Sequence, residues 1–184
     1  MTGRVLVAGV GNIFLGDDGF GVEVAKRLAA TDLPGWVQVA DYGISGMHLA
    51  YDLADSYQTA ILIDTAQRGE KPGTLTVIEA GRPAGPAGPL AETRLFDAHG
   101  MQPDVVLGVL DMLGASSTRV LVVGCEPASL DYGMELSEPV AGAVDAAVRI
   151  VMDLIAKAGA ADGSAADTAE SSGEGAPHVP RHTR

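Results

Sequence analysis

Acidic side chains follow three apolar segments that have the length of β-strands. Asp17 and Asp18 come soon after the first segment, in "GVGNIFLGDDGFG", Asp41 ends the second, and Asp64 ends the third, "TAILIDTA". If the three segments lie parallel in one sheet, their carboxyl ends meet at the edge where sites in α/β proteins gather. Crowded carboxylates are unfavourable unless a cation, a proton or helix N-termini compensate, so we expect a divalent cation there.

One histidine is a candidate to complete such a site. His99 lies in "FDAHGMQPD", after a Gly/Pro-rich loop at residues 81–92 and just before a helix expected at 103–113. His48 is placed on the surface of a short expected helix and is the weaker candidate. Two carboxylates and an imidazole can hold Ni, Zn, Mn or Fe and leave positions open for water or for ligands from a partner.

Each of these residues also has a structural explanation. Asp17 and Asp18 suit the N-cap and first turn of the helix that follows, and Asp41 suits an Asx-turn. His99 suits a surface or capping position in a loop. Asp64 is the hardest to explain in this way, because a carboxylate that ends a buried "AILI" run lies near the core and needs a partner.

Other kinds of chemistry find less support in the sequence. "GVGNIF" resembles the start of a dinucleotide-binding loop, but Phe14 replaces the third glycine and two aspartates follow where a pyrophosphate would lie. Cys125 has no base nearby in the sequence and suits a small buried position. Ser45 and Ser137 suit helix caps, and the sequence has no G-x-S-x-G motif.

Strand-like and helix-like segments alternate along the chain. This order predicts an α/β fold, a three-layer sandwich in which helices cover both faces of a mostly parallel, twisted sheet. One strand, in "GTLTVIEA", alternates apolar and polar residues and closely follows "RGEKPG", so we expect it to be antiparallel in a hairpin-like arrangement. The expected strands are residues 4–10, 36–43, 59–66, 73–80 and 119–125, and the expected helices are 22–29, 45–54, 103–113 and 137–157.

Composition and charge narrow the class of protein. The chain has 184 residues and a formal net charge of −12, which disfavours binding to nucleic acid. Its single cysteine and the lack of a signal-like or membrane-spanning segment predict a cytoplasmic protein, which we expect to be a monomer without a membrane partner. Residues 1–157 form one expected domain, and residues 158–184, poor in large apolar side chains, form an expected disordered tail.

Five motifs resemble those of hydrogenase maturation proteases, in the order found in that family. They are "GVGNIFLGDDGFG", "DYGISGMHL", "ILIDTA", "DAHGMQP" and "VGCEPASLDYGMELSEPV", and the resemblance covers residues 4–156. The paired acids that follow G-x-G-N are its most specific part. The family consists of endopeptidases that remove a C-terminal extension from the large-subunit precursor of nickel–iron hydrogenases.

The resemblance implies a site and a partner. Asp18, Asp64 and His99 match the positions that recognise nickel, which is bound transiently and supplied by the precursor. Asp41 is a candidate general base. An alternative is a non-proteolytic metal-binding or docking factor in cofactor assembly; a nucleotide-binding module and a hydrolase with its own tightly held metal are further hypotheses.

The chain departs from the family pattern in its second motif. That motif usually reads Asp-Gly-Gly-Thr-x-Gly, whereas Tyr42 and Ser45 stand here in place of a glycine and the threonine. Asp41, Gly43 and Gly46 are kept, so we expect the turn to survive with altered neighbouring contacts.

Overall fold

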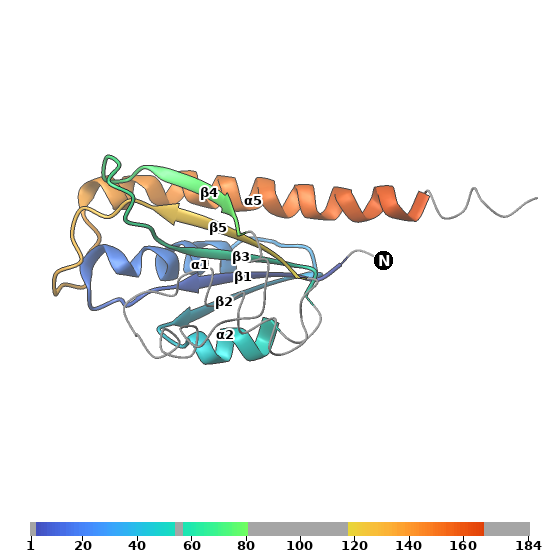
Figure 1. Ribbon diagram of the computed structural model, residues 1–184, viewed down its shortest axis with the longest axis horizontal. Helices are drawn as coiled ribbons and strands as arrows, with labels where there is room; N and C mark the ends of the chain where they lie inside the picture. Colours follow the sequence, from blue (N-terminus) through green and yellow to red (C-terminus); the bar gives the residue numbers. More distant parts are fainter. Residues whose placement is uncertain (1–2, 54–56, 81–117, 168–184) are drawn as a thin grey trace, which may run out of the picture.

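A five-stranded sheet forms the centre of the computed structural model, which describes residues 3–53, 57–80 and 118–167. The order of strands across the sheet is β2-β1-β3-β5-β4 (Figure 1). Continuous Val, Ile and Leu runs in β1, β3 and β5 suit strands that are covered on both faces. The strands are β1 (Val5–Val10), β2 (Val37–Gly43), β3 (Thr59–Thr65), β4 (Leu75–Glu79) and β5 (Arg119–Cys125).

The sheet is parallel except at one edge. β1 pairs in parallel with β2 and β3, β3 pairs in parallel with β5, and β4 pairs antiparallel with β5. The prediction of one antiparallel strand is therefore confirmed, but the hairpin-like arrangement with the preceding strand is wrong. β5, with its continuous apolar sequence, lies between β3 and β4 and pairs with a strand on each side.

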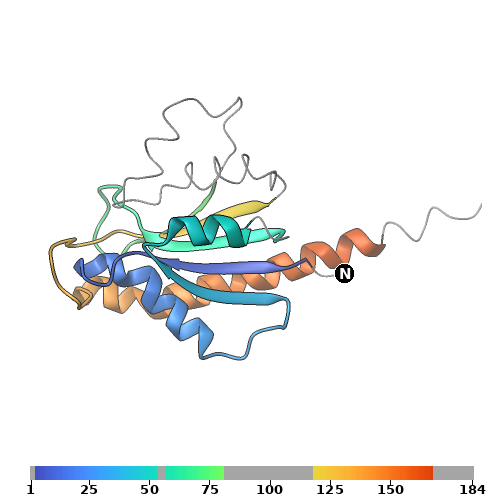
Figure 2. The same cartoon turned by 90° about the horizontal axis from the view of Figure 1, so that it is seen from below.

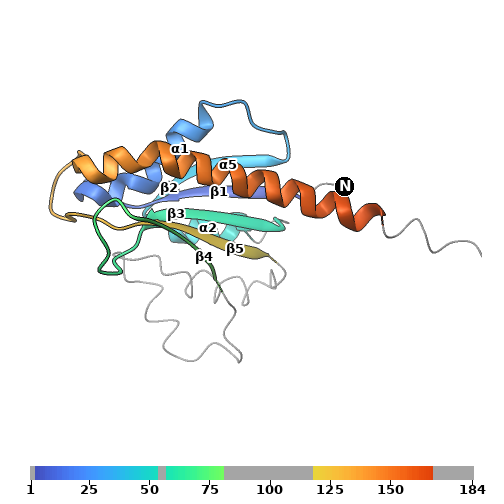
Figure 3. The ribbon, with the colours of Figure 1, turned by 90° about the horizontal axis from the view of Figure 1, so that it is seen from above.

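Helices cover both faces of the sheet, as predicted. α1 (Phe20–Ala29) and α5 (Glu138–Asp167) lie on one face, and α2 (Gly46–Leu53) lies on the other (Figures 2 and 3). The apolar core is accordingly divided into two clusters. One contains Phe20, Leu28 and Val144 beside β1, β3 and β5, and the other contains Leu49 and Leu53.

The last helix is longer than the sequence pattern predicts. We expected it to end near residue 157, where large apolar residues become rare, but α5 continues to Asp167. The added part is rich in alanine, a strong helix former that needs no partner to favour the helical conformation. The remaining tail, residues 168–184, lies outside the described residues, as do the expected loop at 81–92, the expected helix at 103–113 and His99.

Two glycines bring α1 close against the sheet. A Cβ at Gly21 would collide with the carbonyl oxygens of Ile63 and Val10, and a Cβ at Gly9 would collide with Gly21 and Ala25. The short 3-10 helix η1 (Gly16–Gly19), which directly precedes α1, is thereby held at the carboxyl ends of β1 and β3. The glycines of the first motif thus serve close backbone packing.

No helix within the three described ranges is long and apolar enough to cross a membrane.

Candidate functional site

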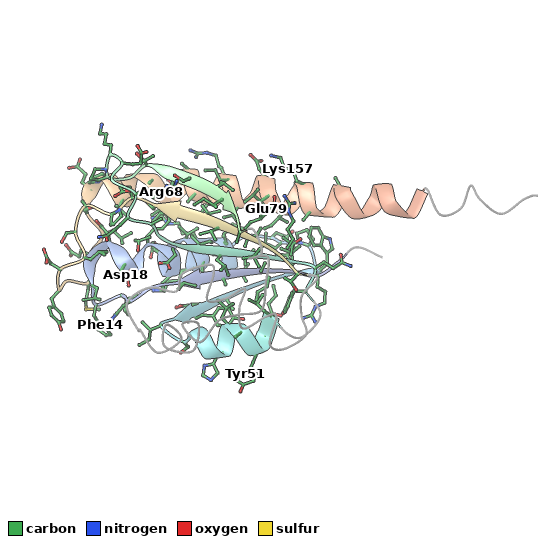
Figure 4. All side chains as sticks on the ribbon, viewed as in Figure 1. Phe14, Asp18, Tyr51, Arg68, Glu79 and Lys157 are labelled. Atoms are coloured by element: carbon green, nitrogen blue, oxygen red, sulfur yellow. The ribbon has the colours of Figure 1, made fainter. Side chains whose placement is uncertain are left out.

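The two adjacent aspartates of η1 have separate surroundings. Asp17 is almost fully buried, at 1% exposure, whereas Asp18 is half-buried and lies toward the end of the sheet (Figure 4). One oxygen of Asp18, Oδ2, accepts a hydrogen bond of 2.7 Å from the backbone N–H of Asn12. Its other oxygen, Oδ1, accepts one of 3.0 Å from the hydroxyl of Thr65. Among the described residues each oxygen has this one partner and can accept a second, so the carboxylate is held in place and still able to bind a cation.

Asp64 lies beside Asp18 at the end of β3. Its Oδ1 accepts a hydrogen bond of 2.7 Å from the backbone N–H of Thr65. Burial, together with the neighbouring negative charge of Asp18, raises the pKa of Asp64 to about 7, although the Thr65 N–H acts in the opposite direction. The shared partner Thr65 brings the two carboxylates together at this edge of the sheet, and their role in binding a metal stays a prediction.

Thr65 is a site residue that the sequence analysis missed. Its backbone N–H bonds Asp64 and its hydroxyl bonds Asp18, so one residue fixes both carboxylates. One feature of the sequence could have identified Thr65, namely its position directly after Asp64 at the end of the strand. What could not be read from the sequence is that Asp18, which is 47 residues away in the chain, reaches that hydroxyl.

Asp17 has a structural role. It accepts hydrogen bonds from the backbone N–H groups of Ala128, Ser129 and Ser137 and from the hydroxyl of Ser137. Burial raises the pKa of Asp17, but these donors outweigh it and lower the pKa below its usual value. Asp17 therefore fastens η1 to the loop between β5 and α5.

The capping interpretation needs correction for Asp17, whereas Ser137 does occupy the capping position of α5. The N-cap of α1 is Gly19, which makes no side-chain capping bond, so Asp17 does not cap that helix through its side chain. Ser137 does precede α5, and its carbonyl oxygen accepts from the N–H of Ala141, but its hydroxyl donates to Asp17. Both side chains are committed to the contact between η1 and the β5–α5 loop, which is long-range and invisible in local sequence.

Asp41 lies in the same sheet, with β1 between its strand and β3. Its side chain is exposed, and its Oδ1 accepts a hydrogen bond of 2.9 Å from the backbone N–H of Gly43, as in an Asx-turn. Gly43 has a φ of 51°, a conformation that favours glycine. The structural explanation of Asp41 is therefore supported, and its role as a general base stays a prediction.

Tyr42 and Ser45, the departures in the second motif, belong to the connection between β2 and α2. Tyr42 is buried, and its hydroxyl donates a hydrogen bond of 2.7 Å to Asp52 on α2. The backbone N–H of Ser45 bonds the carbonyl of Tyr42, and the carbonyl of Ser45 accepts from the N–H of His48. The turn survives, as expected, and Tyr42 ties it to the helix.

Two other residues have the surroundings that the sequence predicted. Cys125 is buried, and burial raises the pKa of its thiol to about 11, which disfavours the nucleophilic thiolate. His48 is exposed on α2. Neither residue joins the carboxylate cluster.

The described part of the site can supply carboxylate oxygens but does not by itself form a metal centre. Within residues 3–53, 57–80 and 118–167, no three His, Cys, Asp or Glu side chains are grouped so that they could hold a metal ion. Asp18 and Asp64 are two hard oxygen donors, and a third ligand must come from His99, from water or from another molecule. Such a pair suits weak, exchangeable binding of a cation.

Known proteins resemble this chain over most of its length. The model of a family described as hydrogenase maturation protease matches residues 22–154. A hydrogenase expression/formation protein, HupD of Rhodobacter capsulatus, is 35% identical over 147 residues, which cover 79% of this chain and 68% of that protein.

Solved structures show the same fold. The hydrogenase 2 maturation peptidase of a Thaumarchaeota archaeon has 35% sequence identity and a TM-score of 0.63, covering 83% of this chain and 98% of that one. The hydrogenase maturating endopeptidase HybD of Escherichia coli has 26% identity and a TM-score of 0.66, covering 85% of this chain and 94% of that one.

Proposed function

The chain belongs to the hydrogenase maturation protease family, and from this premise we propose that it removes the C-terminal extension of a nickel–iron hydrogenase large-subunit precursor. The observation that carries the proposal is the pair Asp18 and Asp64, held together by Thr65 at the carboxyl ends of β1 and β3. In this proposal the pair recognises nickel that the precursor already carries. His99 is the third ligand of the set.

The electrostatics of the pair support a role in recognition. Burial first, and the neighbouring charge of Asp18 after it, raise the pKa of Asp64, so ionising Asp64 without a cation is unfavourable. A divalent cation carried by the precursor removes that cost when it docks. Precursor that lacks nickel leaves the two carboxylates uncompensated and docks poorly.

The chemical step is the hydrolysis of one peptide bond. Nickel enters as part of the substrate, and a Lewis acid beside the scissile bond can polarise the carbonyl or activate water. In the proposal Asp41 accepts a proton from the attacking water and returns it to the leaving amine as the peptide bond breaks. Among the described residues, the exposed carboxylate of Asp41 accepts a hydrogen bond through Oδ1, which leaves Oδ2 to take the proton.

A cleavage assay read by mass spectrometry tests this function. Purified protein is mixed with a hydrogenase large-subunit precursor, nickel-loaded in one sample and nickel-free in the other. The proposal expects loss of a C-terminal peptide only from the loaded precursor. Cleavage in both samples would contradict nickel recognition but keep the protease.

Matched variants distinguish a loss of processing at the site from a loss of folding. Asp64→Asn is expected to abolish processing while the circular dichroism spectrum stays unchanged, because the residue lies at the strand end and not in the apolar core. Asp153→Asn, an exposed position on α5, is the control and should process normally. Binding of the loaded precursor without any cleavage by the wild type would favour the non-proteolytic docking factor.

A further inference from the structure

Three large apolar side chains lie exposed close to the carboxylate pair. Phe14 is 57% exposed, Tyr132 94% and Met134 70%. Phe14 precedes η1, and the other two belong to the loop between β5 and α5, at the end toward which the parallel strands run (Figure 1). We call these three residues the apolar rim. Exposed apolar groups gathered in one place indicate an interaction surface.

Backbone hydrogen bonds hold the two segments of the apolar rim side by side. The N–H of Gly133 donates to the carbonyl of Phe14 over 3.0 Å, and the N–H of Gly16 donates to the carbonyl of Gly133 over 2.8 Å. Leu15 and Gly133 form a parallel β-bridge. Asp17 adds its side-chain bonds to the same loop. The rim is therefore preorganised, which lowers the entropic cost of binding.

A hollow of about 280 Å³ opens beside the rim. Tyr132 and Leu136 contribute apolar lining, and Asp131 and Glu135 contribute carboxylates. Neither of the two segments, residues 11–19 and 127–137, contains a lysine or arginine. This combination suits a lysine or arginine side chain, whose stem packs on apolar atoms while its charged head meets the carboxylates.

The rim is also continuous with the proposed nickel-recognition pair. The backbone N–H of Asn12, two residues before Phe14, donates to Asp18, and Figure 4 shows Phe14 and Asp18 at the same end of the molecule. A protein that presents a cation to Asp18 and Asp64 therefore passes close to the rim. The neighbouring surface is thus available to the same partner.

We propose that the apolar rim and the acidic hollow form the docking surface for the precursor, through an apolar segment that carries a lysine or arginine. The inference rests on the proposed function, since the partner is the proposed substrate. The docking surface binds the precursor away from the cleavage site. The affinity for the precursor therefore depends on residues that do not touch the reacting atoms.

Binding of nickel-loaded precursor, measured by titration calorimetry, tests the docking surface independently of cleavage. The triple variant Phe14→Ser, Tyr132→Ser, Met134→Ser is expected to bind at least about tenfold more weakly, because buried aromatic anchors dominate interface energies. Its KM for cleavage should rise with kcat unchanged. Tyr51→Ser and Met152→Ser, which remove exposed apolar groups 61% and 36% accessible on other elements, are controls and should bind like the wild type.

A double variant tests the acidic hollow. Asp131→Asn with Glu135→Gln should weaken binding and reduce its dependence on salt, since a charge pair at the interface is lost. Unchanged affinity in both the triple and the double variant, with circular dichroism confirming the fold, would overturn the proposal. Wild-type binding without cleavage would instead overturn the proposed function and leave the docking surface standing.

Discussion

At the scale of single residues, the adjacent aspartates Asp17 and Asp18 have different surroundings because their side chains point in different directions. Asp17 turns into the protein and meets three backbone N–H groups and a hydroxyl. Asp18 turns toward the end of the sheet, and each of its oxygens accepts one hydrogen bond from the part of the chain that the structure describes. An N–H-rich pocket stabilises a permanent anion, whereas a carboxylate next to another carboxylate is ready for a cation.

The role of Thr65 leads to a first prediction. Thr65→Val keeps the shape and the backbone N–H to Asp64 but removes the hydroxyl that fixes Asp18. A hydrogen bond to a charged group contributes about 1.5–3 kcal/mol, so processing of nickel-loaded precursor should fall by at least roughly tenfold. The measurement is single-turnover cleavage. Thr65→Ser restores the hydroxyl and should restore most of the rate; equal losses in both variants would refute the positioning role.

Asp17 leads to a stability prediction. Asp17→Asn should lower the free energy of unfolding by about 2–4 kcal/mol, because a buried site with four donors loses its anionic acceptor. Denaturant unfolding measures this, with Asp153→Asn as an exposed control. Since the pKa of Asp17 is lowered in the folded state, its contribution is present above pH about 3.8. The difference between wild type and variant should shrink as pH falls below that value and through the folded pKa.

Asp64 has the opposite pH dependence. Its folded-state pKa is raised to about 7, so the folded protein binds a proton more tightly than the unfolded chain does. Without a metal, stability should therefore fall as pH rises from about 4 to 7, and Asp64→Asn should flatten this slope. Melting temperature against pH gives the comparison. A variant with the same slope as the wild type would contradict the assignment to Asp64.

At the scale of elements, the position of the site depends on how closely α1 approaches the sheet. Gly21→Ala places a Cβ against the carbonyl oxygens of Ile63 and Val10, which are backbone atoms and cannot turn aside. We expect a loss of about 3 kcal/mol or more in unfolding free energy. The control is Gly142→Ala on α5, where a Cβ meets nothing within 4 Å. It should be neutral or stabilise by up to about 1 kcal/mol.

The close packing of α1 on the sheet also fixes the position of Asp18. α1 follows η1 directly, so a shift of α1 away from β1 and β3 moves Asp18 away from Thr65. Gly21→Ala should therefore reduce processing even at temperatures where the protein stays folded. Full processing by a folded Gly21→Ala protein would show that the site tolerates this displacement.

At the scale of the whole molecule, one face of α5 packs against the rest of the fold and stabilises it, with buried side chains up to residue 155. Val140, Val144, Ala147, Val151 and Ile155 are buried in the cluster shared with α1 and the sheet. Trp36 covers Gly159 on the same helix, at 3.0 Å from the position of a Cβ there. Burial along the helix defines how far the chain can be shortened.

Truncated chains test which part of α5 the fold requires. A chain that ends after Asp167 should keep the melting temperature and processing rate of the full chain. A chain that ends after Arg149 loses Val151 and Ile155 and should not fold stably, since each large buried side chain contributes about 2–5 kcal/mol. Loss of processing in the first chain, with its stability unchanged, would instead assign a function to the tail.

The sequence by itself determined the α/β class, the described strands to within a few residues, and the presence of acids at the carboxyl ends of three strands. These features follow from local pattern, because apolar runs and glycine turns specify elements through their immediate neighbours. The motifs also led to the family. The surface position of His48 and the burial of Cys125 followed from the same local reasoning.

Only the tertiary structure decided which acids lie together. β5 inserts between β3 and β4, the hydroxyl of Ser137 goes to Asp17, and Thr65 joins Asp18 to Asp64. The β4–β5 pairing, the Ser137–Asp17 bond and the Thr65–Asp18 bond connect residues far apart in the chain. Their energies depend on burial and on distance, which no local pattern carries. The exposed apolar rim likewise exists because two distant loops pair through their backbones, so its residues become one surface only in the folded protein.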